Sequence, residues 1–297
     1  MGTFIIAMIM FLALVTIHEF GHFIVAKLSG IKVNEFAVGM GPEIFSKQNG
    51  ETKYSLRLLP IGGYCAMEGE DESSSDPRSY DNAPAFKRFL TILAGPVMNL
   101  LLAVIVFTIV AFNTGTSTTF VGGFSENSPA KEAGISVDDQ IVAINNQNID
   151  EFTDISKILA DYYSKNAKDS PVEVVTKTTK GSEKTYNITP TFENDIPLLG
   201  ISSKMRNVNF IEAIGLGFKE TGRNVKMIFN ILGMLITGKL SFGALSGPVG
   251  VVKEIGNQAR NGAMSVLYFL SYISVNLAVF NLIPFPALDG SKLVTNL

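Results

Sequence analysis

The sequence predicts a mainly α-helical polytopic membrane protein. We expect three membrane helices, a soluble α+β domain inserted between the second and the third, and a membrane-associated β-hairpin. The chain of 297 residues is 46% hydrophobic and 17% charged, whereas soluble proteins are about 25% charged. Charge is absent from residues 1–17, 89–125 and 261–288, and such apolar runs match a hydrocarbon core about 30 Å thick. With a net charge of −3 and no basic block, nothing indicates nucleic acid as a partner.

The first apolar run predicts a membrane helix over 4–26, within an N-terminal segment 1–26. A signal peptide is the weaker interpretation, because no basic residue precedes the run and no small-residue cleavage pattern follows it. The polar segment 27–88 comes next. Its alternating stretch from Tyr54 to Met67 predicts a β-hairpin with its turn at Gly62 and Gly63.

The second membrane helix is predicted over 89–112, and the charges that flank it give an orientation. Four basic residues border the segment 27–88, whereas none precedes the first helix. The positive-inside rule therefore puts 27–88 in the cytoplasm, and the N-terminus and the following segment on the outer side. These four residues are Lys27, Lys32, Lys87 and Arg88.

Residues 115–204 have the composition of a soluble α+β domain. Alternating patterns predict strands at 139–144 and 171–176, and a helix is expected over 152–163. About 90 residues can bury a modest core of their own.

An amphipathic helix is predicted from Phe210 to Thr237, within a region 208–258. Two interpretations stand equal: the helix lies in the membrane interface, or it packs on the rest of the protein. The third membrane helix is predicted over 263–285, and the last segment, 286–297, contains Asp289.

The strongest chemical signal is the H-E-x-x-H motif His18-Glu-Phe-Gly-His22. Positions i and i+4 share one face of a helix, so both imidazoles can reach one Zn²⁺ ion. Glu19 is placed to take a proton from water activated by that ion. The chain has two histidines, and both fall in this motif. Such residues are costly inside an apolar helix unless they have a function.

A catalytic zinc site needs a third protein ligand, and no third histidine exists. Asp289 is the leading candidate, because it ends a charge-free apolar run beside the helix-breaking Pro284 and Pro286, which would let it turn inward from an extended segment. Cys65, the single cysteine, is the rival, since thiolates bind zinc well. A lone cysteine excludes an intrachain disulfide and a multi-cysteine metal site.

These motifs bring the chain close to a known family. It resembles the site-2 proteases, which are intramembrane zinc metalloproteases, and in particular the bacterial sigma-factor-signalling type with a single PDZ domain. The resemblance implies that His18, His22 and Asp289 hold zinc and that Glu19 is the general base. It covers almost the whole chain and rests on these motifs: His18-Glu-Phe-Gly-His22, Phe36-Ala-Val-Gly-Met-Gly41, Leu59-Pro-Ile-Gly-Gly-Tyr64, Met67-Glu-Gly-Glu70, Ala94-Gly-Pro-Val-Met-Asn99, Leu245-Ser-Gly-Pro-Val-Gly250, Ser274-Val-Asn-Leu277 and Asn281 to Gly290.

The resemblance extends to the outer domain and to the substrates. Residues 115–204 fit the family's circularly permuted PDZ pattern, so peptide binding or steric filtering is expected of them. The implied substrates are single-span membrane proteins, such as anti-sigma factors or remnant signal peptides, cleaved in the plasma membrane near its cytoplasmic side. The family signature usually continues Gly-Gly-His after the aspartate, whereas this chain has Gly290-Ser-Lys292, which leaves the ligand positions intact. A fourth membrane helix normally follows, so we expect the chain to be part of a longer protein.

A helical substrate must be unwound before its carbonyls can be attacked. We expect the hairpin around Gly62 and Gly63 to hold the unwound segment, and Asn276 and Asn281 either to bond its backbone or to bridge helices. Asn99 is expected to make a contact between helices. Two other classes of protein compete with the protease: a membrane-anchored peptide-binding module and a zinc transporter. A scaffold has no need of Glu19, and a transporter needs several ligand sets.

Overall fold

The computed structural model describes residues 2–70, 72–241, 243, 247–286 and 288–295. Leu245 and Ser246 of the sequence motif at 245–250 lie outside these described residues, as do Met1, Ala287 and the end of the segment 286–297. The chain forms two compact units. One comprises the residues up to Ala111 and those from Phe210 onward, and the other comprises Phe112–Asn209.

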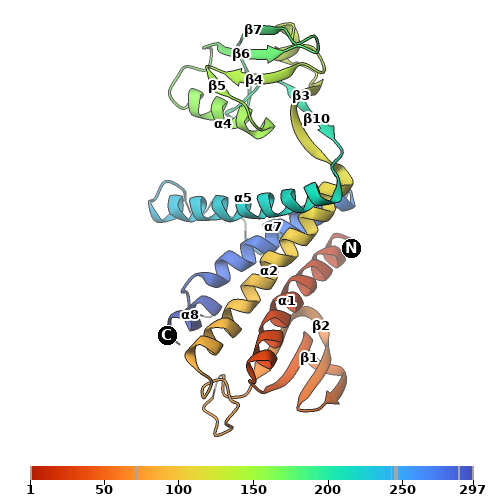
Figure 1. Ribbon diagram of the computed structural model, residues 1–297, viewed down its shortest axis with the longest axis vertical. Coiled ribbons are helices and arrows are strands. Elements are labelled where there is room, and N and C mark those ends of the chain that lie inside the picture. The colour runs from red at the N-terminus through yellow and green to blue at the C-terminus, as the bar shows by residue number, and fades with distance from the viewer. Residues whose placement is uncertain (1, 71, 242, 244–246, 287, 296–297) are drawn as a thin grey trace. The chain divides into compact units, whose positions relative to one another are not determined.

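Three helices of the described chain are long and apolar enough to cross a membrane. They are α1 (Gly2–Ser29), α2 (Ala85–Thr114) and α7 (Ala263–Leu282), and Figure 1 shows them in the first unit. Their positions agree with the three helices predicted from the sequence. α1 and α2 extend a few residues into polar sequence, because Lys27 and Lys87 continue the helical turns beyond the apolar runs.

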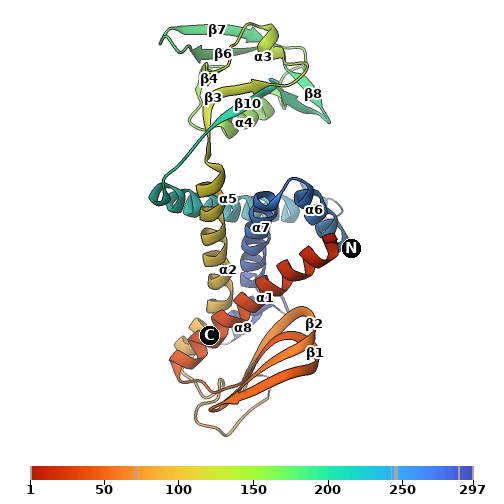
Figure 2. The same cartoon turned by 90° about the vertical axis from the view of Figure 1, so that its right-hand side faces the viewer.

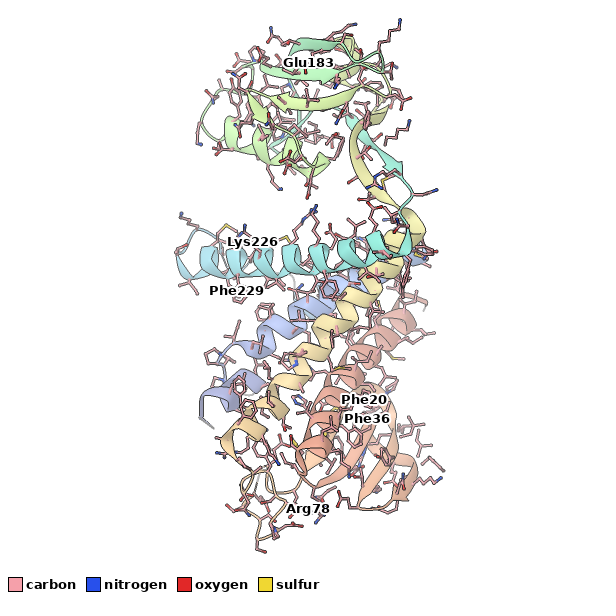
Figure 3. The ribbon with its side chains drawn as sticks, in the orientation of Figure 1. Phe20, Phe36, Arg78, Glu183, Lys226 and Phe229 are labelled. Atoms are coloured by element: carbon pink, nitrogen blue, oxygen red, sulfur yellow. The ribbon has the colours of Figure 1, made fainter. Side chains whose placement is uncertain are left out.

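Helix α5 (Phe210–Ile236) lies across α2 and α7 (Figures 1 and 2). Its buried Ile228 packs with Phe107 of α2 and Val279 of α7. Other apolar side chains of α5, including Phe218 and Phe229, are exposed; Phe229 is labelled in Figure 3. Packing on the protein thus accounts for one stripe of α5, and a second apolar stripe beside it remains exposed.

In the described part of the region 208–258, a second helix follows the predicted one. After α5 the chain forms α6 (Pro248–Arg260). Its Ile255 is fully buried against Ala7 and Met10 of α1, so α6 packs beside the first membrane helix.

The segment between α1 and α2 contains a β-hairpin, but its turn is not where the sequence analysis put it. Strand β1 (Val33–Asn49) is followed by β2 (Thr52–Met67), and the turn lies at Gly50, whose φ is +61°. The two loop residues are Gly50 and Glu51, and glycine at the first loop position is typical of a type II′ hairpin turn, so the signal was present. The expected hairpin within Tyr54–Met67 is wrong, because both halves of that stretch pair with β1 and not with each other.

Both strands bend, so that their pairing gives four rows of backbone. Residues 33–38 pair with 63–67 on one side and with 53–56 on the other, and 43–49 pair with 52–57. Row 63–67 is therefore an edge, and no further strand of the described chain pairs with it. Phe20 of α1 contacts Phe36 of β1 edge to face, with ring centroids 6.2 Å apart (Figure 3), which seats α1 against this sheet.

The second unit is an α+β domain. Its sheet has the order β10-β3-β4-β6-β7, β5 pairs with β4, and β8 pairs with β9. Its core contains the fully buried Ile141, Ile144 and Val174, and α4 covers it with Ile155 and Leu159. The helix predicted at 152–163 is confirmed. The elements are β3 (Thr116–Phe124), α3 (Pro129–Glu132), β4 (Gln140–Ile144), β5 (Gln147–Asn148), α4 (Phe152–Tyr163), β6 (Val172–Lys177), β7 (Glu183–Ile188), β8 (Thr191–Glu193), β9 (Ile196–Leu198) and β10 (Ile201–Arg206).

Candidate metal centre

The two histidines of α1 point their rings at one spot. His18 and His22 are one helical turn apart and buried, so their side chains lie on the same face. Their Nε2 atoms are 3.3 Å apart, and the rings meet edge to face. Two unprotonated ring nitrogens at this separation repel each other unless a proton or a cation lies between them.

Asp289 brings a carboxylate to the same spot from the other end of the chain. Its Oδ2 lies 2.9 Å from His18 Nε2 and 3.3 Å from His22 Nε2. Asp289 does not lie in an extended segment, as predicted from the sequence, but is the first residue of a short helix, α8 (Asp289–Thr295). The prolines end α7 as expected, and the chain then starts a new helix. Burial would raise the pKa of Asp289, but its bonds to His18 and His22 outweigh burial and keep this pKa below the usual range.

The geometry of these three residues fits a tetrahedral zinc ion. Zinc bonds of 2.0–2.1 Å put the ligand atoms of a tetrahedron about 3.3 Å apart, close to the separations found here. Each residue offers one ligand atom, and the three atoms lie within 4.8 Å of one another. Two imidazoles and one carboxylate are the donors of hydrolytic zinc sites, and they leave one position open.

Hydrogen bonds from the ring nitrogens that face away from this spot orient both histidines. His22 Nδ1 donates to the carbonyl oxygen of Thr91, at 2.8 Å, which leaves the lone pair of Nε2 for a metal. His18 Nδ1 lies 3.1 Å from Asn99 Nδ2, while Asn99 Oδ1 is buried without a partner. Exchanging the two amide atoms lets Oδ1 accept from Nδ1–H and frees the His18 Nε2 lone pair. Asn99 therefore orients the zinc ligand His18. It also makes the predicted contact between helices, because Ser274 Oγ of α7 donates to the main-chain carbonyl oxygen of Asn99.

Gly95 of α2 leaves the space that the two rings occupy. A β-carbon at this position would lie 2.8 Å from His18 Cε1 and would collide with His22. A side chain here would fill the cradle of the imidazoles. Gly95 was not predicted as a site residue; a glycine inside an apolar helix is the sequence signal that marks such a position.

Glu19 stands beside the three ligand atoms without joining them. Its Oε2 accepts a hydrogen bond from the main-chain N–H of Cys65, at 3.1 Å, so the carboxylate is tied to the edge row 63–67. A cavity of about 440 Å³ opens here. Its lining includes Glu19, His22, Tyr64, Cys65, Glu70 and Asp289.

The other predicted site residues lie around this cavity to different degrees. Cys65 lines it, but its sulfur is not part of the cluster of ligand atoms; burial and the charges of Glu19 and Glu70 raise the pKa of its thiol. Gly62 and Gly63 shape the start of the edge row, where a β-carbon on Gly63 would lie 2.7 Å from Ala37 O. Neither glycine is among the lining residues.

Asn276 and Asn281 of α7 are not among the lining residues either. Asn276 Nδ2 donates to the carbonyl oxygen of Tyr272 in its own helix, at 2.8 Å. Asn281 is buried, near the end of α7.

Comparison with known proteins identifies the family. The family model described as peptidase family M50 matches residues 6–297. A "putative zinc metalloprotease" of Clostridium acetobutylicum is 40% identical over 289 residues, which are 96% of this chain and 84% of the relative. One of Clostridium perfringens is 40% identical over 99% of this chain and 87% of the relative, and one of Fusobacterium nucleatum is 34% identical over 98% and 87%. The chain therefore belongs to peptidase family M50 and is a membrane zinc metalloprotease.

Proposed function

We propose that the protein is an intramembrane endopeptidase that cleaves single-span membrane proteins. Zinc is held by His18, His22 and Asp289, and Glu19 is the general base. The observation that carries this proposal is the meeting of the three ligand atoms within 4.8 Å. Two of them come from a helix apolar enough to span the bilayer, and the third follows another such helix.

The residues divide the chemistry between them. Bound zinc supplies a Lewis acid for the scissile carbonyl and lowers the pKa of water at its open position. The Glu19 carboxylate accepts the proton of the attacking water and delivers it to the leaving amine nitrogen. The hydrogen bond from Cys65 N–H orients that carboxylate. The position of the general base relative to the edge row 63–67 is therefore fixed.

The edge row 63–67 is the proposed binding place for the unwound substrate. A strand edge offers main-chain donors and acceptors to an extended peptide, here apart from the Cys65 N–H that donates to Glu19. Tyr64, Cys65 and Met67 of this row line the cavity beside Glu19 and Asp289. A segment added to the row would therefore have its carbonyls at the metal. The roles of Gly62 and Gly63 are then to let the row approach β1 closely.

The proposed orientation has the N-terminus and the second unit outside the cell, and the metal centre near the cytoplasmic side. Basic residues flank the cytoplasmic ends of α1 and α2. In a Cys65→Ser background, a cysteine at Glu183, exposed on β7 (Figure 3), should react with an impermeant maleimide on intact cells. A cysteine at Arg78 should react only after lysis. The reverse labelling pattern would contradict this orientation.

In the second unit, we propose peptide capture rather than simple steric filtering. A cavity of about 760 Å³ lies between α4 and the start of β10, with Ile155, Leu159 and Ile201 in its lining. β10 ends the strand order of its sheet, so a peptide strand can be added there. Saturable binding of extended peptides, lost in Ile201→Asp, is expected, because Ile201 lines the cavity and is only partly buried. If the full chain binds no peptide but removing the unit admits larger substrates, filtering is the function.

The test of the activity uses the full chain in liposomes with a single-span reporter. Glu19→Gln should keep zinc and lose cleavage, because only the proton acceptor is removed. Asp289→Ala should lose both zinc and cleavage, and Cys65→Ser should retain both. Cleavage by Glu19→Gln at the wild-type rate would refute the assignment of the base. Zinc uptake into the liposomes without cleavage would instead indicate a transporter.

A further inference from the structure

An ion pair outside the proposed chemistry borders the metal cavity. Lys292 Nζ lies 2.7 Å from Glu70 Oε1, and the two residues are 222 positions apart in the chain. Both line the cavity that contains Glu19 and Asp289. The Glu70 side chain is 14% exposed, so its carboxylate is largely withdrawn from water and needs a partner.

The pair joins two parts of the site that are otherwise separate. Glu70 follows the edge row 63–67 by three residues, and Lys292 lies one turn after Asp289 on α8. The bond therefore links the sheet edge to the helix that begins with the third ligand atom.

Helix α8 depends on such contacts for its position. A helix of seven residues is not stable alone in water, and α8 is attached to α7 through a stretch that contains Pro284 and Pro286. Leu293 is its apolar contact, packed against the cluster that includes Cys65, Met67 and Ile92. The Lys292–Glu70 pair adds a polar contact between α8 and the same sheet edge, beside the contact of Asp289 with His18.

We infer that the Glu70–Lys292 ion pair is a clasp that holds α8 against the edge row and thereby sets the zinc affinity through the position of Asp289. Glu70 and Lys292 are positioning residues, since neither is among the three ligand residues. This inference rests on the proposed role of Asp289 as a ligand. Contacts that orient metal ligands typically contribute ~10–100-fold to metal affinity.

A simple effect of charge on the cation makes a different prediction, so the two can be separated. Removing the positive charge of Lys292 would leave more negative charge near the metal and strengthen binding; removing the negative charge of Glu70 would weaken it. A clasp predicts that both changes weaken binding, because either one breaks the bond that holds α8.

The experiment measures the zinc dissociation constant by chelator competition, on the full chain in detergent. Lys292→Met and Glu70→Gln should each raise it by about tenfold. Lys292→Arg, and the double variant Glu70→Lys with Lys292→Glu, should restore it to within about threefold of the wild type, because each re-forms the pair.

The matched control is Lys27→Met. It removes the Lys27–Glu51 pair, which has the same 2.7 Å length and a lysine of similar exposure but does not border the cavity, and it should leave zinc affinity unchanged. Opposite shifts in the two single variants, an unrestored double variant, or a lower unfolding temperature of the apoprotein with unchanged zinc affinity would each overturn the clasp. Asp289→Ala distinguishes a failure of the clasp from a failure of the proposed zinc site: if this variant retains zinc, the site itself is wrong.

Discussion

Replacing Gly95 with alanine tests the metal centre through its packing. The added β-carbon would lie 2.6 Å from His22 Cε1 and 2.8 Å from His18 Cε1, whereas ordinary contacts are 3.4–4 Å long. His22 Nε2 would lie closer still, so the rings or α2 must move by more than about 0.8 Å, whereas metal–ligand distances tolerate only about 0.2 Å. We expect Gly95→Ala to lower zinc affinity by about 100-fold, at the upper end of what displaced ligand support costs.

The helix itself should not suffer from this change. Alanine is favoured over glycine in a helix by about 1 kcal/mol, so the apoprotein should keep its helical content. The assay is chelator competition for zinc, with circular dichroism of the apoprotein. Gly215→Ala in α5 is the control, because a β-carbon there meets no atom within 4 Å. Zinc binding by Gly95→Ala within threefold of the wild type, with an unchanged fold, would refute the convergence of the two rings beneath Gly95.

Further expectations concern the hydrogen bonds, the core of the second unit and the metal. Asn99→Ala should lower zinc affinity by about tenfold, because His18 loses the partner that orients it; unchanged affinity would contradict the support role. Ile141→Ala should destabilise the second unit by about 3 kcal/mol, seen as faster hydrogen exchange of β4, while zinc affinity stays constant. Faster exchange throughout α1 as well would contradict the independence of the two cores. Chelation should abolish cleavage, and added zinc should restore it; activity that persists in the metal-free protein would refute the zinc mechanism.

The membrane helices were predictable because their signal is local. An apolar run of sufficient length forces a helix wherever it enters a bilayer, so α1, α2 and α7 follow directly from composition. The hairpin was predicted with the wrong turn. The alternating pattern of Tyr54–Met67 indicates that both halves of this stretch are strands. It does not indicate that β1 pairs between the two halves. Strand order is a long-range property, and only the glycine at the first loop position, Gly50, marks the turn in the sequence.

In the metal centre too, local features were predictable from the sequence and features that depend on long-range packing were not. His18 and His22 are found from spacing alone, since one helical turn brings them together. Asp289 was inferred because a zinc site needs a third protein ligand and the chain has no third histidine. This reasoning limits the candidate ligands but does not show where they lie in the fold. Asn99, Gly95 and Lys292 acquire their importance only when α2 and α8 are packed beside α1. The replacement of the usual histidine by Lys292 was visible in the sequence, but its partner Glu70 was not.

The free edge of row 63–67 has a consequence for how such an enzyme sorts its substrates. Main-chain pairing carries almost no information about side chains, because every residue except proline presents the same donor and acceptor. A protease that holds its substrate by this edge distinguishes chains by how readily a few residues leave the helical state. Glycine, or polar side chains that compete for main-chain bonds, lowers that cost, whereas runs of leucine and alanine raise it. The readable property of a substrate is then the local stability of its helix, and two unrelated sequences that unwind equally well would be cleaved equally well.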